Sequence, residues 1–115
     1  MDEPPVESFD VASLEEARAE VQHRTGELYL EFLRRDSMSC GLYVLEAGAT
    51  DPQEPHDEDE VYVVLSGRGR LRAGGRDEPV DPGSVLFVAR TVPHRFSEIS
   101  ERLSVLVFFA PAESG

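Results

Sequence analysis

Two histidines, His56 and His94, carry the chemistry that this sequence offers. His56 precedes three acidic residues at 57–59, and Glu60 then begins an apolar stretch. One interpretation is a solvated acidic loop. The other is one half of a metal site, because imidazole and carboxylate groups bind divalent transition metals. His94 follows a short turn that contains Pro93, so both histidines lie where a turn leads into a predicted strand. This shared placement weakens the interpretation as an acidic loop.

We assign no catalytic or metal-binding role to the third histidine or to the single cysteine. His23 falls in the last turn of a predicted helix, where the helix dipole favours a cation, so we take it as a structural or surface residue. Cys40 is expected to be a small buried residue, since nothing near it in the sequence would lower its pKa. A lone cysteine forms no internal disulfide, which agrees with a reducing compartment.

The composition limits the possible partners. The 115 residues suffice for one domain, and the net charge is −12 with arginine as the only basic residue type other than histidine. A chain this acidic repels phosphate backbones, which argues against nucleic acid as a partner. No apolar run approaches the roughly 20 residues that span a bilayer, so no membrane partner is expected. The N-terminus is acidic and contains prolines, unlike a signal peptide, and we expect a cytoplasmic protein.

One helix and an all-β remainder are predicted. The stretch 13–26 has capping-box spacing at Ser13 and Glu16 and a stop signal at Gly26. From residue 27 onward, apolar stretches alternate with turn residues, which favours a sandwich or barrel over a parallel sheet. We therefore predict an arm and helix over residues 1–26 and a barrel domain over residues 27–115. The expected strands lie within 27–35, 40–47, 60–67, 69–75, 78–90, 94–99 and 102–111.

Two of these strands are apolar on both faces, at 61–65 and 103–109. A half-exposed antiparallel strand alternates apolar with polar residues instead, so the second faces of these strands need cover. Two explanations stay open. The arm and helix cover the second faces, or a second subunit does so in a homodimer.

The spacing around the histidines resembles that of a small single-domain cupin of the cupin 2 type, over about residues 40–110. The first cupin motif reads Gly, five residues, His-x-His, three or four residues, Glu, six residues, Gly. Here Gly48, Glu54, His56, Glu60 and Gly67 keep these intervals, with Glu54 in place of the first histidine.

The second cupin motif reads Gly, five residues, Pro-x-Gly, two residues, His, three residues, Asn. The corresponding positions are Gly83, Ala89, Thr91, His94 and Glu98. The intervals agree, but Ala89 and Thr91 replace the proline and glycine, and Glu98 replaces the asparagine. The resemblance implies an all-β fold, the double-stranded β-helix or conical jelly-roll-like barrel, with a short N-terminal helix.

The resemblance also implies that His56, Glu60 and His94 bind a divalent metal. Two imidazoles and a carboxylate suit iron(II), manganese, nickel or zinc and leave coordination positions open. Glu54, two residues before His56, would supply a fourth and harder ligand, while Gln53 is a weaker substitute. A remnant site without metal is the alternative.

Strand alternation predicts which other side chains share the metal's side. The lining is expected to be mainly apolar and aromatic, which suits a small organic ligand. Arg90, Arg95 and Arg102 are candidates for holding an anionic substrate, but alternation turns Arg95 outward. The expected lining residues are Tyr62, Val64, Phe96 and Glu98, with Tyr43 or Leu42 and Phe108 or Phe109 depending on register.

Three functions are compatible with these residues, because one fold carries many activities. We favour a metal-dependent enzyme acting on a small organic molecule, and an oxygen-using one in particular. The alternative is a non-catalytic binding or regulatory protein in which the metal is structural or absent. The third is an epimerase that uses a histidine and an acid without a metal.

Overall fold

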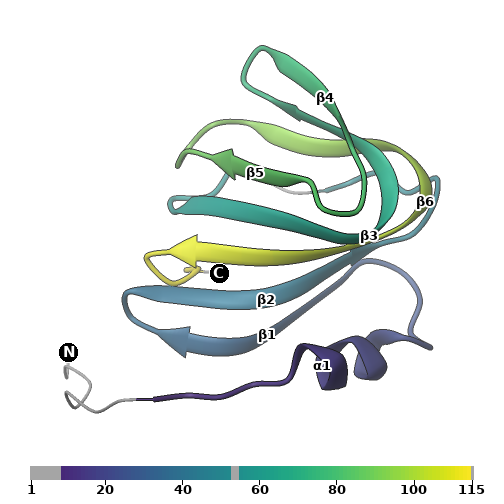
Figure 1. Cartoon of the computed structure of the whole chain (residues 1–115). Coiled ribbons are helices and arrows are strands. Elements are labelled where there is room, and N and C mark those ends of the chain that lie inside the picture. Colours follow the sequence, from purple (N-terminus) through teal and green to yellow (C-terminus); the bar gives the residue numbers. More distant parts are fainter. Residues whose placement is uncertain (1–8, 53–54, 115) are drawn as a thin grey trace.

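One helix and six strands make up the regular structure in the computed structural model, which describes residues 9–52 and 55–114 (Figure 1). Within these residues, no helix is long and apolar enough to cross a membrane. The elements are α1 (Leu14–Val21), β1 (Leu28–Arg35), β2 (Met38–Leu45), β3 (Asp59–Ala73), β4 (Arg76–Val80), β5 (Val85–Val88) and β6 (His94–Ala110).

The strands form an antiparallel barrel, which confirms the predicted all-β double-stranded β-helix. Their order is β1-β2-β6-β3-β4, and β5 pairs with β3. The long strands β3 and β6 pair from Asp59 opposite Ala110 to Ala73 opposite His94. Both strands curve strongly (Figure 1), with irregular register between Val64 and Arg70. This curvature brings the two ends of one ladder back toward each other.

The long strands differ from the prediction of separate short ones. The expected break between the strands at 60–67 and 69–75 is an irregularity inside β3 instead, where Gly67 has a φ of 93°. A Cβ at this position would collide with the backbone carbonyl of Arg102 in β6. Glycine therefore lets β3 and β6 stay in contact through the bend, rather than ending the strand. The stretch 78–90 carries turn residues at Asp81, Pro82 and Gly83, and a turn at 81–84 does separate β4 from β5 there, as expected.

The helix begins as predicted but ends early. The Ser13 side chain accepts a hydrogen bond from the backbone N–H of Glu16 at 3.1 Å. The buried face, Ala17 and Val21, packs on the outer face of the sheet. The helix stops at Val21, so the prediction that it contains His23 is wrong, and His23 lies in an exposed turn beyond it.

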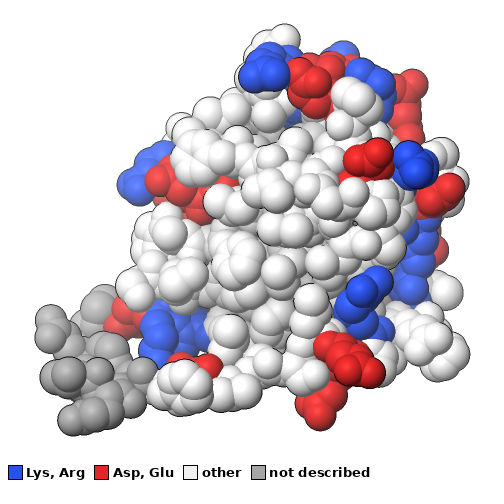
Figure 2. All heavy atoms as spheres, in the orientation of Figure 1, with Lys and Arg blue, Asp and Glu red and all other residues white. Residues whose placement is uncertain are grey.

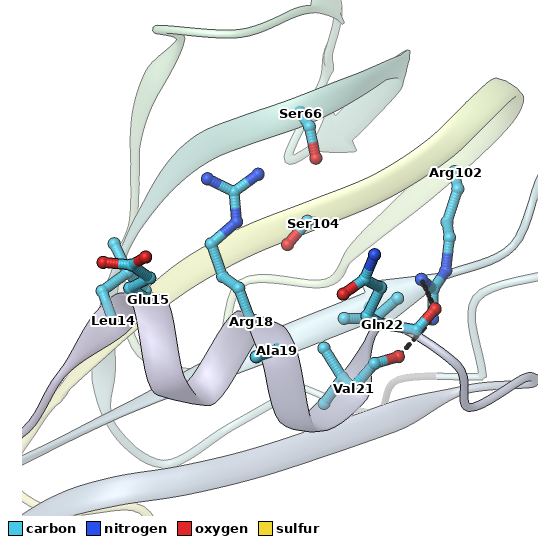
Figure 3. Close-up of a pocket in the computed structure, with 10 residues that line it drawn as sticks. Leu14, Glu15, Arg18, Ala19, Val21, Gln22, Ser66, Arg102 and Ser104 are labelled. Atoms are coloured by element: carbon cyan, nitrogen blue, oxygen red, sulfur yellow. Dashed lines mark hydrogen bonds between the residues drawn. The ribbon is translucent and has the colours of Figure 1, made fainter.

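Arg102 in β6 fixes the end of this helix to the sheet. Its Nη2 donates to the carbonyls of Val21 at 3.1 Å and Arg24 at 2.7 Å, and its Nε pairs with Glu46 at 2.9 Å. A cation is favoured at a helix C-terminus, where carbonyls lack partners. A groove of about 650 Å³ runs between α1 and the sheet, with Arg18, Ser66 and Ser104 beside it (Figure 3). No histidine is among the described residues that line this groove.

The sheet has two apolar faces, and only one is fully buried. The inner face forms the barrel core, with Tyr62, Phe96 and Leu103 at 0% exposure. On the outer face, α1 covers the region around Leu42 and Val44. Beyond the helix the outer face stays open over β6, β3 and β5, where Figure 2 shows an uncharged expanse with charged side chains around its margin. The side chains on this open face are Val61, Val63, Val85, Phe87, Leu106 and Phe108.

Candidate metal centre

His56, Glu60 and His94 meet inside one end of the barrel, with one ligand atom from each within 4.8 Å of the others. The Nε2 of His56 lies 3.3 Å from one oxygen of Glu60, and the Nε2 of His94 lies 3.1 Å from the other. The two imidazole rings are 5.8 Å apart between centroids. The two ring nitrogens therefore face one carboxylate, each opposite a different oxygen.

Three separate segments position these side chains. Glu60 is the second residue of β3, and His94 is the first of β6, at the opposite end of the β3–β6 ladder. The bend in both strands closes this distance. His56 comes from the loop before β3, and its carbonyl accepts a hydrogen bond of 2.7 Å from the backbone N–H of Thr91. The loops that precede β3 and β6 are thereby joined directly beneath the site.

A backbone contact fixes the orientation of the His94 ring. Its Nδ1 donates to the carbonyl of Val92 at 2.9 Å, which leaves Nε2 toward Glu60 and the Tyr62 hydroxyl, 3.0 Å away. Burial opposes the charged imidazole, but the hydrogen bonds with Glu60 and Val92 and the Glu60 charge hold the pKa of His94 above its usual value. A positive charge at this nitrogen, from a proton or a metal ion, is stabilised.

The carboxylate of Glu60 shows whether these residues fit a metal. It is 1% exposed. Apart from the contacts with the two imidazoles, no described residue gives either of its oxygens a hydrogen bond. A buried carboxylate whose only polar partners are imidazoles is destabilised unless an imidazole is protonated or a metal ion lies between them. Two imidazole nitrogens and one carboxylate are a ligand set for iron(II), manganese, nickel or zinc. The residues fit a divalent transition metal.

Most of the residues predicted to line the cavity lie on the inner face of the barrel, as strand alternation predicted. Tyr62, Val64 and Phe96 are buried in the barrel core, as predicted. Of each ambiguous pair, the structure selects Tyr43 and Phe109 for the inside, while Leu42 and Phe108 lie on the outer face. Glu54 and Gln53 lie outside the described residues.

The prediction that Glu98 lines the cavity is wrong. Glu98 has a φ of 46°, its side chain is 74% exposed, and it lies 3.6 Å from Arg70 on the surface. This left-handed residue shifts the alternation of β6 by one position, and Ile99 occupies the buried place instead.

The three arginines considered for an anionic substrate lie elsewhere. Arg95 is exposed, as alternation predicted. Arg90 is exposed and lies 3.7 Å from Asp59, and Arg102 fixes α1. The prediction that Arg90 or Arg102 holds a substrate in the cavity is therefore wrong.

A cavity of about 160 Å³ lies beside His56. Four of its lining residues were not predicted from the sequence: Glu27, Tyr29, Val107 and Glu113. One signal for Tyr29 was Gly41, because a glycine within an apolar strand marks a close approach. A Cβ on Gly41 would lie 2.6 Å from the Tyr29 ring. The full lining is Glu27, Tyr29, Tyr43, His56, Tyr62, Val107, Phe109 and Glu113.

A buried acid, Asp51, supports this cavity and was also missed. It is 0% exposed. One oxygen accepts a 2.7 Å hydrogen bond from the Tyr43 hydroxyl, and the other accepts a 2.9 Å bond from the backbone N–H of Phe96. Cys40 is buried as predicted, and burial raises the pKa of its thiol to about 11, so it is not a nucleophile.

Comparison with known proteins agrees with this architecture. An uncharacterized protein of Streptomyces coelicolor is 50% identical over 101 residues, covering 88% of this chain and 95% of that protein. The crystal structure of TT1209 from Thermus thermophilus matches with a TM-score of 0.76 at 23% identity, covering 90% of this chain and 99% of that one. The DMSP lyase DddQ from Ruegeria pomeroyi matches with a TM-score of 0.69 at 18% identity, covering 87% of this chain and 54% of that one.

The two structural matches show a shared fold. The family assignment comes from the sequence itself, because the cupin domain model matches residues 41–109, more than half of the chain. That segment contains both histidines, Glu60 and the long strands that bring them together. The chain belongs to the cupin family.

Proposed function

We propose that His56, Glu60 and His94 bind a divalent transition metal, and that the protein is an enzyme acting on a small organic molecule in the adjacent cavity. The observation that supports this most directly is the Glu60 carboxylate, buried and facing only the two imidazoles among the described residues. One structural neighbour is described as a lyase, which agrees with an enzymatic use of this barrel. Among cupin activities we favour an oxygen-using one, since the ligand set suits iron(II).

A bound metal would supply Lewis acidity and open coordination positions for a substrate or oxygen. The chain's own residues supply the rest. The Nδ1–H of His94, held by the Val92 carbonyl, keeps Nε2 available as a ligand. Val107 and Phe109 make one wall of the cavity apolar and limit water, while the Tyr43 hydroxyl provides a fixed polar point within it.

Open coordination is the property that separates an enzyme from a protein with a structural metal. Protein loaded anaerobically with iron(II) and exposed to nitric oxide is expected to give the paramagnetic resonance signal of an iron–nitrosyl species. A closed site would admit no exogenous ligand. Iron that binds stoichiometrically but gives no signal would contradict the enzymatic proposal and favour the non-catalytic one.

We further propose Glu54 as a fourth, weaker ligand, from its place in the cupin spacing. Glu54→Ala is expected to weaken zinc binding by about tenfold or more, since even a partner outside the ligand set typically contributes about 10–100-fold. Competition with a chromogenic chelator measures the change. Asp57→Ala, an exposed acid of the same loop, is the control. Equal small effects of both variants would remove Glu54 from the ligand set.

The open outer face leads us to propose a homodimer as the working assembly. Val85 and Phe87 are 68% and 65% exposed, and they lie beside Val63 and Val61 in the paired strand. Contiguous exposed apolar surface of this kind marks an interaction site. An isologous pairing of two copies would cover it.

Sedimentation is expected to give about twice the chain mass at micromolar concentration, and Phe87→Glu is expected to give a monomer, because a charge would be buried in the interface. Phe9→Glu makes the same change at a residue that is 84% exposed and outside the sheet. A wild-type monomer, or a Phe87→Glu variant that remains dimeric, would contradict this assembly.

A further inference from the structure

The cavity beside His56 offers hydrogen-bond acceptors. The Tyr43 hydroxyl donates its only proton to Asp51 at 2.7 Å, so the oxygen's remaining capacity is to accept. Glu27 lies 3.4 Å from the same hydroxyl, and its carboxylate also only accepts when ionised. A ligand in contact with these groups must therefore donate.

A second carboxylate, Glu113, is held at the cavity by the C-terminal segment. The backbone N–H of Glu113 donates to the Ser39 hydroxyl at 3.0 Å, and its carbonyl accepts from Arg34 at 2.8 Å. The Ser114 hydroxyl donates to Glu58 at 2.9 Å. Burial is the main cause that raises the pKa of the Glu113 carboxyl. A cation nearby would offset this desolvation and stabilise the charged form.

Among the described residues that line this cavity there is no arginine, and the chain contains no lysine. Arg34 lines a neighbouring surface pocket with Glu113, and its guanidinium is paired with Glu31 at 2.8 Å. An anionic ligand would thus lie near the acids Glu27 and Glu113. Apart from the imidazole of His56, no basic side chain of the described lining would offset their charge. Carboxylates and phosphates are disfavoured by this charge pattern.

Aromatic rings complete the surroundings. Tyr29 and Phe109 meet edge to face, with centroids 6.1 Å apart, and Tyr43 pairs with Tyr29 across the strands. Ring faces attract organic cations. The hydroxyl of Tyr29 is buried, and the described residues give it no hydrogen-bond partner.

We propose that this cavity selects a small organic cation, a primary ammonium compound with a short apolar body, whose nitrogen donates to Glu27, Glu113 and the Tyr43 oxygen. The apolar body would lie against Val107 and Phe109. As a substrate assignment, this inference rests on the proposed function, because it gives the substrate class of the same site.

A matched series of three probes tests the selection: propylammonium, 1-propanol and propionate, which share an alkyl chain and differ in charge. Each is titrated into metal-free protein, because a zinc ion with an open position would bind the propionate carboxylate directly. Binding is followed by NMR shifts of the Val107 and Phe109 amides. Propylammonium is expected to bind about tenfold tighter than 1-propanol, and propionate to bind no tighter than the alcohol. Propionate or the alcohol binding tightest would overturn the proposal.

Two variants locate the effect. Glu27→Gln combined with Glu113→Gln is expected to weaken propylammonium by at least about tenfold and to leave 1-propanol unchanged. Glu15→Gln with Glu20→Gln removes the same charge from the exposed face of α1 and is expected to change neither. An unchanged propylammonium affinity in the first variant would contradict the assigned contacts.

The same samples separate this inference from the metal proposal. Zinc binding is measured on a separate portion of each protein, so that the metal-free titrations report the two acids alone. Protein that binds zinc but does not prefer the ammonium probe would refute only the substrate class. Protein that prefers the ammonium probe but binds no zinc would refute the metal centre and leave the cation site.

Discussion

Glu60→Gln is expected to lower metal affinity by more than about 100-fold and, at the same time, to make the metal-free protein more stable than the wild type. Loss of affinity follows because the amide replaces the only charged ligand among the three. Stability rises because the wild-type carboxylate is 1% exposed and has no hydrogen-bond donor beyond the two imidazoles in the described structure. Removing this buried charge is stabilising because its only partners are imidazoles, and an imidazole can lose its proton and stay neutral once the carboxylate is gone.

Metal affinity falls while the stability of the metal-free protein rises only if the role of Glu60 is to bind the metal. The midpoint of thermal unfolding is measured with chelator and again with zinc. Wild-type protein gains RT ln(1 + [Zn]/Kd), about 2.7 kcal/mol at a hundredfold excess over Kd, and the variant gains almost nothing. Glu58→Gln is the matched control, since Glu58 is also buried, at 3% exposure, but lies outside the ligand group. A metal-free Glu60→Gln protein less stable than the wild type would show that Glu60 has a structural role.

Alternation along single strands was the part of this site that could be predicted from the sequence. Starting from Glu60 and His94, a period of two correctly places Tyr62, Val64 and Phe96 inside the barrel. The same rule fails at Glu98, because a left-handed residue interrupts β6 and shifts the phase of everything after it. No alternation rule locates such a residue, because the rule assumes an unbroken strand.

The meeting of the three candidate ligands required information of another kind. Glu60 and His94 lie at opposite ends of the β3–β6 ladder, and only the bend at its irregular middle brings them together. The spacing shared with cupins implied this meeting, whereas strand patterns alone did not. Glu113 was missed for a related reason, since it follows the last strand and reaches the cavity through contacts of the C-terminal segment.

Asp51 could not be predicted from the sequence, because it lies in a loop and yet is completely buried. An aspartate beside a proline is typical of an exposed turn, and nothing local distinguishes this one. Its role follows from two groups distant in sequence, the backbone N–H of Phe96 and the hydroxyl of Tyr43, which donate to its two oxygens. The loop before β3 is thereby attached to both β6 and β2.

Asp51→Ala is accordingly expected to lower the free energy of unfolding by about 2–4 kcal/mol, because it leaves two buried donors without an acceptor. Denaturant titration of metal-free protein measures the loss without interference from metal binding. Tyr43→Phe takes one donor from the buried Asp51 carboxylate but leaves the bond from the Phe96 amide, so it is expected to cost less, about 1–2 kcal/mol. Asp57→Ala, exposed in the same loop, is expected to change stability by less than about 0.5 kcal/mol.

The double variant Asp51→Ala, Tyr43→Phe gives the sharper result. If the two groups stabilise the protein through their shared hydrogen bond, the double variant loses less than the sum of the single losses, because phenylalanine no longer presents an unpaired hydroxyl. Strictly additive losses would mean that the Asp51–Tyr43 hydrogen bond does not contribute to the stabilisation by Asp51. In that case Tyr43 would keep its proton free for a ligand, and the cavity would offer a donor at that position.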